Sequence, residues 1–263
     1  MYEMLYFLVV GLFAGLIGGL LGVGGGFIFI PAQLLIYNYF EIPRELQIKL
    51  AIATSLAAVV FNVAASSYVH HTNNAIYFPI IKKIIVGIIL GSVLGAFAAE
   101  IISSSYLEIL FGMFECLFGV YFIFSPNLAS TSPFNNLNFL IMNMLVICTS
   151  ALSIILGVGG GIFLIPLLTL LHLPLRQAIG SSSLATLMVA LIGALIMIVP
   201  TLESCTTPFA LGYLYLPAFI PLSMGAIISA PFGAKLTHTI PVFLLKKLFG
   251  WFLIILGIIV LIR

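Results

Sequence analysis

Charged residues are scarce in this 263-residue chain, and one kind is missing altogether. Lys, Arg, Asp and Glu together make up 6% of the residues, against about 25% in a typical soluble domain, and every acidic residue is Glu. A soluble fold of this size could not cover its surface with so few charges. A net charge of +2 also excludes the basic surface that binds nucleic acid. The absence of Asp removes Asp-based proton relays, aspartic proteases and aspartyl-phosphate pumps.

Several motifs that carry chemistry are also missing. The sequence contains no G-x-x-x-x-G-K-[ST] loop for ATP hydrolysis and no H-E-x-x-H helix for zinc. The three cysteines, Cys116, Cys148 and Cys205, are far apart in apolar surroundings, which favours small buried residues over disulfides or metal ligands. We therefore expect a protein that is not an enzyme and that has no cofactor and no metal site.

Apolar sequence fills the chain instead. Hydrophobic residues make up 63% of it, and the mean hydropathy is +1.32. A spanning helix needs about 20 apolar residues, so the chain has room for on the order of eight to ten membrane segments and no soluble domain. The composition predicts an all-α polytopic protein of the cell (cytoplasmic) membrane, with the lipid bilayer as its surroundings and no nucleic acid as a partner.

Two copies of one pattern follow each other along the chain. The stretch Gly22-Val-Gly-Gly-Gly recurs as Gly157-Val-Gly-Gly-Gly, and Pro31 recurs as Pro166 at the same offset of 135 residues. Tyr77 and the glycines of the later segments recur at an offset of 138 residues. Several separated landmarks with few changes of offset indicate an internal duplication.

A short motif of small and polar residues in the middle of each copy completes this alignment. Thr54-Ser-Leu-Ala57 aligns with Ser182-Ser-Leu-Ala185. We predict a first transmembrane repeat at 1–124, a polar, turn-rich inter-repeat loop at 125–136, and a second repeat at 137–263. In the plain spanning segments, glycines spaced by four residues predict close helix packing.

The first apolar run of each repeat is broken by its glycines. The segments that follow, about 27–38 and 162–171, are too short to cross an ordinary bilayer core. A single crossing of each broken run would give four crossings per half and parallel repeats, whereas a hairpin would give inverted repeats. Lys and Arg divide six against three in both cases, so the positive-inside rule does not choose. The glycine break favours two inverted repeats, each with one glycine-broken helix pair and about three further spanning helices.

Paired, interrupted short segments in two halves are typical of a transporter's binding site. Bare backbone within a membrane is tolerated where protein buries it or where it lines a watery cavity. Helix starts in such a cavity suit an anion, and no Lys or Arg lies in the middle of a predicted segment. Alternatively, the glycines only permit close crossing and the hydroxyls bond to their own helices. The predicted substrate-binding residues are Gly22, Gly24, Gly25, Gly26, Pro31, Thr54, Ser55 and Asn62, with Gly157, Gly159, Gly160, Gly161, Pro166, Ser181, Ser182 and Ser183.

Glu115 is the carboxylate in the middle of a predicted spanning segment. A charged group within the bilayer is expensive, and an intramembrane carboxylate is a functional hypothesis by default. It could exchange a proton that is coupled to transport. It could equally be a neutral acid that is hydrogen-bonded to a neighbouring helix.

From Gly15 to Pro31 the chain reads G-L-I-G-G-L-L-G-V-G-G-G-F-I-F-I-P, which resembles the sulfite exporter TauE/SafE family of membrane transporters. The second copy, Leu156–Pro166, resembles it equally, and so do Gly180–Leu184 and Ser229–Leu236. The resemblance implies a secondary transporter, often an exporter, of sulfite, organosulfonates or related anions. A passive anion channel, a transporter of other small organic acids, a membrane-embedded enzyme and an accessory subunit are the alternatives, and a homodimer stays open.

Overall fold

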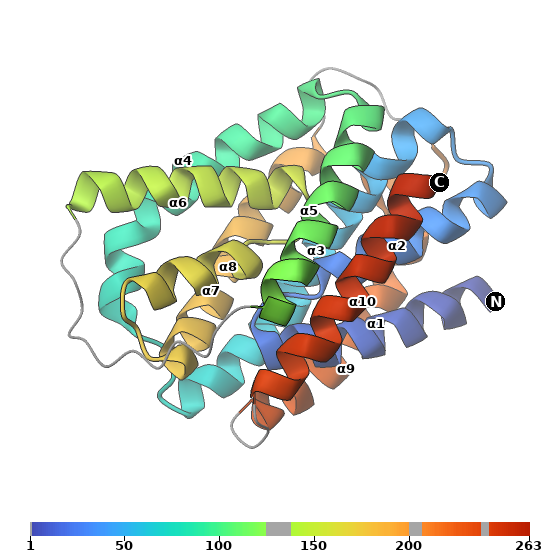
Figure 1. The fold of residues 1–263 in the computed structure, drawn as a ribbon. Helices are drawn as coiled ribbons and strands as arrows, with labels where there is room; N and C mark the ends of the chain where they lie inside the picture. The colour runs from blue at the N-terminus through green and yellow to red at the C-terminus, as the bar shows by residue number, and fades with distance from the viewer. Residues whose placement is uncertain (1, 125–137, 200–206, 238–241) are drawn as a thin grey trace.

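The computed structural model describes residues 2–124, 138–199, 207–237 and 242–263, and within these the chain is almost entirely helical (Figure 1). The predicted loop at 125–136 lies outside the described residues. The first repeat holds α1 (Tyr2–Leu21), α2 (Gly26–Tyr37), a 3₁₀ turn (Asn38–Phe40), α3 (Arg44–Thr72), α4 (Phe78–Ile101) and α5 (Ser104–Phe124). The second holds α6 (Phe139–Ile155), α7 (Gly161–Leu170), α8 (Leu175–Ile198), the antiparallel pair β1 (Ala210–Leu211) and β2 (Leu214–Tyr215), α9 (Leu216–Leu236) and α10 (Val242–Ile262).

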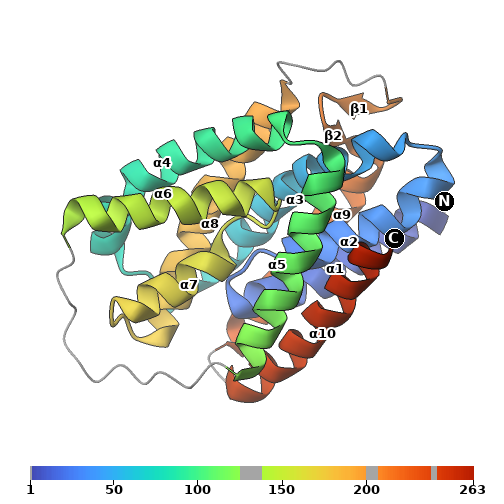
Figure 2. The same cartoon turned by 45° about the horizontal axis from the view of Figure 1, so that its top comes forward.

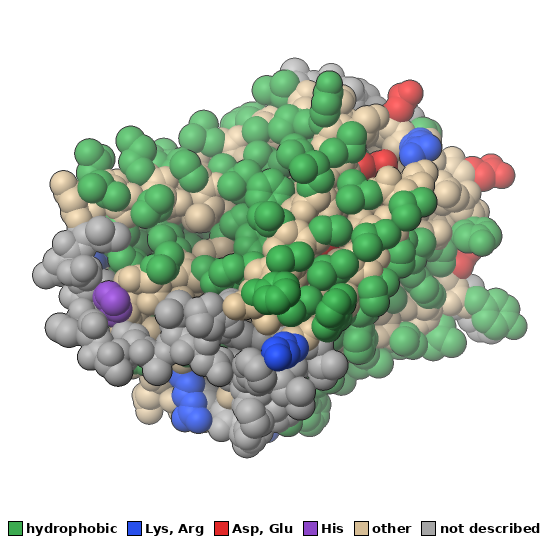
Figure 3. All heavy atoms as spheres, viewed as in Figure 1, with side chains coloured by type: hydrophobic (Ala, Val, Ile, Leu, Met, Phe, Trp, Pro, Cys, Tyr) green, Lys and Arg blue, Asp and Glu red, His purple; other side chains and the backbone are tan. Residues whose placement is uncertain are grey.

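Six of these helices are long and apolar enough to cross a membrane, namely α1, α3, α4, α5, α8 and α9. This confirms the prediction of a multi-pass membrane protein. By contrast, α2 and α7 contain only 12 and 10 residues. At 1.5 Å per residue they reach about 18 and 15 Å, well short of the roughly 30 Å hydrocarbon core. Hydrophobic side chains are spread over much of the described surface that is visible in Figure 3.

At the first glycine stretch the chain reverses, so that α2 runs back along α1 (Figure 1). The Tyr6 hydroxyl near the start of α1 donates to the Ala32 carbonyl in α2 at 3.0 Å. A Cβ added at Gly25 would lie 2.8 Å from the Ala14 carbonyl oxygen. These contacts pair the two helices in opposite directions, so the broken run is a hairpin within the protein.

The two repeats are interlocked through their first helices. α1 packs along α9 of the other repeat, and the corresponding α6 packs along α4 (Figures 1 and 2). The last helices of the repeats, α5 and α10, pair with each other. Gly112 of α5 lies beside Gly257 of α10, while Gly119 lies beside Gly250, so this pair runs antiparallel. α3, the most buried of the six long helices, packs against α8 and α9.

Small residues line the two contacts in which the first helix of one repeat crosses the fourth helix of the other, α1 with α9 and α6 with α4. A Cβ at Gly87, Gly91 or Gly95 of α4 would meet backbone or side-chain atoms of α6 at 3.0 Å or less. On the other side, Gly11, Gly15 and Gly19 of α1 lie in the same way against α9. This confirms the predicted close packing, which drives helix association in lipid in place of the hydrophobic effect.

At one position in each crossing a glycine faces a serine. In one crossing the glycine is on the first helix of its repeat, and in the other crossing it is on the fourth. Gly15 of α1 faces the Ser229 hydroxyl of α9, whereas Gly91 of α4 faces Ser150 of α6. By the offsets of the repeats, Ser150 corresponds to Gly15 and Ser229 corresponds to Gly91. The two crossings are therefore equivalent in geometry and complementary in sequence.

Gly91→Ser should destabilise the protein by about 1–3 kcal/mol, because its Cβ would clash with the Ile147 carbonyl oxygen and lie 2.9 Å from the Ser150 Cβ. The double variant Gly91→Ser/Ser150→Gly reproduces the composition of the α1–α9 crossing and should recover the part of the loss that comes from Ser150. Unfolding free energies in detergent measure both effects, with the lipid-facing Leu90→Ala as a control on the same helix. A double variant no more stable than Gly91→Ser would contradict the equivalence of the two crossings.

Candidate functional site

The two glycine turns, residues 22–25 and 157–160, meet inside the helix bundle. A Cβ added at Gly26 would lie 2.7 Å from the Gly157 carbonyl oxygen. Reciprocally, a Cβ at Gly161 would lie 2.6 Å from the Val23 Cα. The start of α2 thus lies against the turn of the second repeat, and the start of α7 lies against the turn of the first.

Gly24 and Gly159 show why these positions are glycine. Their φ angles of 88° and 83° fall in the left-handed region, which side chains of L-residues rarely adopt. From either position a Cβ would lie 2.7 Å from Val59 Cγ1, and Thr186 Cγ2 would be 3.4 and 3.1 Å away. Val59 of α3 and Thr186 of α8 therefore touch both turns at the centre of the pseudo-symmetry. The sequence did not identify either as a predicted site residue.

Both turns are buried and packed against protein. Residues 22–31 and 156–162 are buried throughout. The bare backbone of the turns is therefore tolerated because protein buries it, and not because it lines a watery cavity. An anion could lie between the turns only if they separated.

The starts of α2 and α7 each present the positive end of a helix dipole, as the sequence predicted. Their N-cap residues, Gly25 and Gly160, provide no side-chain acceptor. The Gly25 carbonyl accepts from the Ile28 N–H at 3.0 Å, and the Gly160 carbonyl accepts from the Phe163 N–H at 3.1 Å. The N–H groups before these have no acceptor within the helix and form the positive end of its dipole. Two such ends come together where the repeats meet.

Polar side chains of α3 and α8 hold the turns in place. Three predicted side chains donate to carbonyl oxygens there, Ser55 to Gly157 at 2.8 Å, Asn62 to Gly24 at 3.0 Å and Ser182 to Gly161 at 3.3 Å. Beside the turns, two buried polar atoms have no hydrogen-bond partner among the described residues, Asn62 Oδ1 and Thr186 Oγ1. Because buried polar atoms are rarely left unpaired, these two can still accept or donate to a bound group.

Thr54 of α3 and Ser181 of α8 lie beside the starts of α9 and α4, the fourth helices of the two repeats. The Tyr215 N–H at the start of α9 donates to Thr54 Oγ1 at 2.9 Å, and the Tyr77 N–H at the start of α4 donates to Ser181 Oγ at 2.9 Å. Both hydroxyls therefore cap helices across the repeat boundary. The matching roles make Ser181 the structural counterpart of Thr54.

This pairing corrects the predicted alignment of α3 with α8 by one residue, because the sequence placed Ser182 opposite Thr54. A shift of one residue rotates a helix by about 100° and changes which face is compared. In the corrected register Asn62, beside Gly25, corresponds to Val189, which lies 3.5 Å from the Cβ position of Gly160. The two halves of the site are therefore unequal.

The other predicted site residues lie away from the turns. Ser183 Oγ is hydrogen-bonded to the hydroxyls of Ser66 and Ser67 at 3.1 and 2.8 Å. Pro31 and Pro166 lie inside α2 and α7, about 7.5 Å beyond the first residue of each helix. Because proline has no backbone N–H, each of them removes one hydrogen bond from its own helix, and neither is hydrogen-bonded to a described residue of the turns.

Glu115 is fully buried on α5, which packs against α10. Among the described residues, neither of its carboxylate oxygens has a hydrogen-bond partner. Its counterpart in the second repeat, Leu253, is also fully buried. The structure therefore places Glu115 on a different helix pair from the glycine turns.

Comparison with known proteins supports the resemblance over nearly the whole chain. The family described as sulfite exporter TauE/SafE matches residues 7–260. A probable membrane transporter protein of Haemophilus influenzae is 31% identical over 260 residues, covering 95% of each chain. A probable membrane transporter protein of Methanocaldococcus jannaschii is 28% identical over 237 residues, covering 89% of this chain and 86% of the relative. No solved structure matches the chain significantly.

Thr54→Val should destabilise the protein by about 1–3 kcal/mol, because it leaves the N–H of Tyr215, a residue 5% exposed, without its acceptor. Ser181→Ala should cost less, because its hydrogen bond to the Tyr77 N–H is only partly buried, whereas the one between Thr54 and the Tyr215 N–H is buried. Unfolding free energies of the two variants in the same detergent check the difference. A larger loss for Ser181→Ala would contradict the assigned capping roles.

Proposed function

Because the chain belongs to the sulfite exporter TauE/SafE family of membrane transporters, we propose that it is a secondary transporter that exports a small sulfur-containing anion, such as sulfite or an organosulfonate, across the cell membrane. The observation that carries the anion class is the meeting of two helix N-termini at buried glycine turns. Backbone N–H groups at such termini bind oxyanions without a basic side chain.

The placement of the cations supports a site of this kind. Each Lys and Arg side chain that the structure describes lies within about two turns of a helix end. Recognition by backbone N–H groups and neutral donors such as Thr186 is weaker than recognition by a buried Arg. A weak site can release its anion on the far side of the membrane, which turnover requires.

The packed turns imply that binding is accompanied by movement. The hairpins α1–α2 and α6–α7 carry the turns, and each hairpin is packed on the fourth helix of the other repeat. We propose that the repeats are inverted and that one hairpin moves against the other, opening the turns to one side at a time. The antiparallel pairing of the equivalent helices α5 and α10 supports this, because repeats of the same orientation would hold them parallel.

The charges at the two ends of the bundle support an orientation. At the end where α4, α8 and α10 begin and α9 finishes, the described cations are Lys82, Lys83, Arg176, Lys235 and Lys247. The opposite end has Arg44, Lys49 and Arg263. It also holds five of the acidic residues, and acidic side chains are visible at this end in Figure 3; they are Glu3, Glu41, Glu45, Glu100 and Glu108. By the positive-inside rule, the end rich in lysine faces the cytoplasm.

Purified protein in liposomes should move sulfite or an organosulfonate with saturable, gradient-driven kinetics. Gly25→Leu and Gly160→Leu should each abolish most of the flux, because both side chains would occupy the turns. Thr186→Val removes only an unpaired hydroxyl, so it should leave stability unchanged and raise the KM roughly tenfold. Leu90→Ala, which faces lipid, is the control.

The panel of anions should contain sulfite, sulfate, thiosulfate, sulfonates and carboxylates. Flux that rises linearly without saturation would favour a passive channel, and flux of carboxylates alone would favour a transporter of organic acids. Hydrolysis of a substrate by the purified protein would favour an enzyme. Normal flux in both leucine variants would contradict the assignment of the turns.

Glu115 is the group that we propose exchanges a coupling proton, because it is a fully buried carboxyl group and neither oxygen has a hydrogen-bond partner in the described part of the chain. Glu115→Gln keeps the shape of the side chain but cannot exchange a proton. It should flatten the pH dependence of flux near neutrality, whereas Glu41→Gln, a change at an exposed carboxylate, should not. An unaltered pH profile in liposomes would refute the coupling role.

A further inference from the structure

Buried hydroxyl groups join α3 to α8 on one side of the glycine turns. Ser183 Oγ of α8 is hydrogen-bonded to the hydroxyls of Ser66 and Ser67 of α3, and each of the three side chains is at least nine-tenths buried. Ser66 lies four residues, about 6 Å, beyond Asn62 on α3. Ser183 lies three residues, about 4.5 Å, before Thr186 on α8. This hydroxyl cluster therefore lies between the turns and the lysine-rich end, where α3 ends and α8 begins.

Polar side chains on α3 connect the cluster to the first turn. Asn62, Ser66 and His70 are spaced by four residues, so they share one face of the helix, and all three are fully buried. Asn62 donates to the Gly24 carbonyl at 3.0 Å, which joins this face to the turn. Among the described residues, Asn62 Oδ1 and Thr186 Oγ1 have no hydrogen-bond partner, and each lies about one helical turn from the cluster. Polar groups thus extend from the turn to the last turn of α3.

The equivalent contact on the other side of the turns is apolar. In the corrected register of α3 against α8, Ser66 corresponds to Gly193. Ser183 likewise corresponds to Leu56. These two counterparts also meet, because a Cβ added at Gly193 would lie 3.1 Å from Leu56 Cδ1 and 2.8 Å from Ile154 Cδ1. A hydrogen-bonded contact on the lysine-rich side is therefore matched by a close apolar contact on the opposite side.

The other polar side chains on this part of α3 have apolar counterparts as well. Val189 stands in the place of Asn62, Ala194 in that of Ser67, and Met197 in that of His70. Ser67 and Ala194 are each 6% exposed, so this pair differs in polarity and not in burial. The two sides of the turns therefore have the same packing but opposite affinity for water.

This difference decides which side can be hydrated. Hydroxyl groups that bond to one another can exchange these bonds for bonds to water or to an oxyanion, because each is both a donor and an acceptor. Opening the apolar contact would instead expose Leu56 and Ile154 to water with no hydrogen bond in return. The lysine-rich end also favours an anion, since none of the acidic side chains that the structure describes lies there.

We propose that the anion reaches the glycine turns from the lysine-rich end along the polar contact between α3 and α8, and that the hydroxyl cluster binds it on the way. As the turns separate, Ser66, Ser67 and Ser183 donate to the oxyanion in place of one another. The apolar contact of Leu56 with Gly193 stays closed in that state and keeps water from the opposite side. The role in transport rests on the proposed function, whereas the hydration of the polar contact does not.

Single cysteines test this passage in a chain whose three native cysteines are replaced by Ser. Ser67→Cys lies in the polar contact, Ala194→Cys is its matched control in the apolar one, and Thr72→Cys at the exposed end of α3 is the reference. The reagent is 2-sulfonatoethyl methanethiosulfonate, an organosulfonate that reacts with thiols, applied in detergent so that both ends are open to it. Ser67→Cys should react roughly tenfold faster than Ala194→Cys. Equal rates would overturn the proposal.

The cationic analogue, 2-(trimethylammonium)ethyl methanethiosulfonate, tests whether the passage favours anions. Dividing each rate at Ser67→Cys by the rate of the same reagent at Thr72→Cys removes the intrinsic difference in reactivity. This ratio should be roughly tenfold higher for the sulfonate, because the passage offers hydroxyl donors and its mouth is positive. A ratio that is equal for the two reagents, or higher for the cation, would refute an anion passage.

The double variant Ser66→Gly/Ser183→Leu gives the polar contact the composition of the apolar one. It should lower the sulfonate's reaction at Ser67→Cys roughly tenfold, with the unfolding free energy in the same detergent as the check on folding. Ser183→Ala, a smaller change, should lower it severalfold and replaces the double variant if that does not fold. An unchanged rate in a folded variant would contradict the role of the hydroxyls.

Liposome flux separates this passage from the proposed function. Flux together with equal reaction at Ser67→Cys and Ala194→Cys would overturn the passage alone. Faster reaction at Ser67→Cys without flux would leave the passage standing and overturn the transport function.

Discussion

The fold depends on how backbone polar groups are covered where two helices are interrupted inside an apolar bundle. Neither glycine turn could remain alone within a membrane, because its N–H and C=O groups would lack partners. In this protein each turn is covered by the start of the short helix of the other repeat, with Gly26 against Gly157 and Gly161 against Val23. Side chains such as Ser55 and Asn62 complete the hydrogen bonding. One repeat could not satisfy the constraint without the other.

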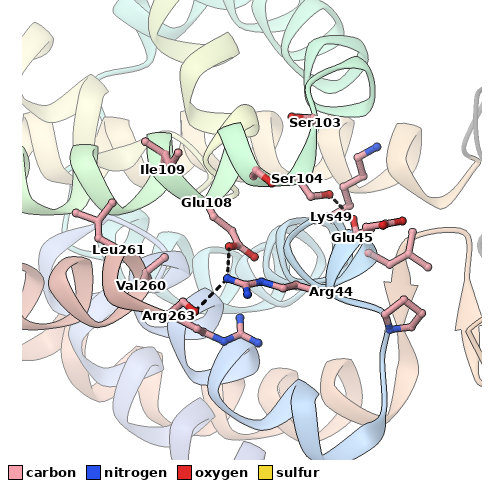
Figure 4. Close-up of a pocket in the computed structure, with 13 residues that line it drawn as sticks. Arg44, Glu45, Lys49, Ser103, Ser104, Glu108, Ile109, Val260, Leu261 and Arg263 are labelled. Atoms are coloured by element: carbon pink, nitrogen blue, oxygen red, sulfur yellow. Dashed lines mark hydrogen bonds and ion pairs between the residues drawn. The ribbon is translucent and has the colours of Figure 1, made fainter.

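The interlocked helices follow from this arrangement. Because the turns must meet, the hairpins that carry them must cross into the opposite repeat, and α1 and α6 become neighbours of α9 and α4. Glycines at both crossings let the backbones approach closely, which provides packing contacts where lipid offers no hydrophobic driving force. The last helices then pair with each other, and a cavity lined in part by charged side chains opens where α10 ends near the starts of α3 and α5 (Figure 4).

Much of the architecture could be predicted from residue order. The glycine clusters and their prolines indicated the duplication, the short α2 and α7, and the break that makes a hairpin possible. The register of α3 against α8 could not, because Ser181, Ser182 and Ser183 offer three similar alignments and only packing distinguishes the helix faces. The sequence also did not show whether the bare backbone faced water or a second backbone, since the partner lies 135 residues away. Arg44 donates a hydrogen bond to the Arg263 carbonyl, and no local sequence pattern indicates that these two residues lie close together.

The corrected register shows that the two turns are held by different side chains. Asn62 ties the first turn to α3 through the Gly24 carbonyl, but the equivalent position beside the second turn is Val189, which has no polar group to offer. In a duplicated carrier with identical halves, the inward-facing and outward-facing states would have equal free energy. The second turn is tied to α3 in another way, through the Ser55 hydroxyl, which donates to the Gly157 carbonyl. On the mechanism that we propose, the two facing states therefore differ in free energy, because a carboxamide holds one turn and a hydroxyl holds the other.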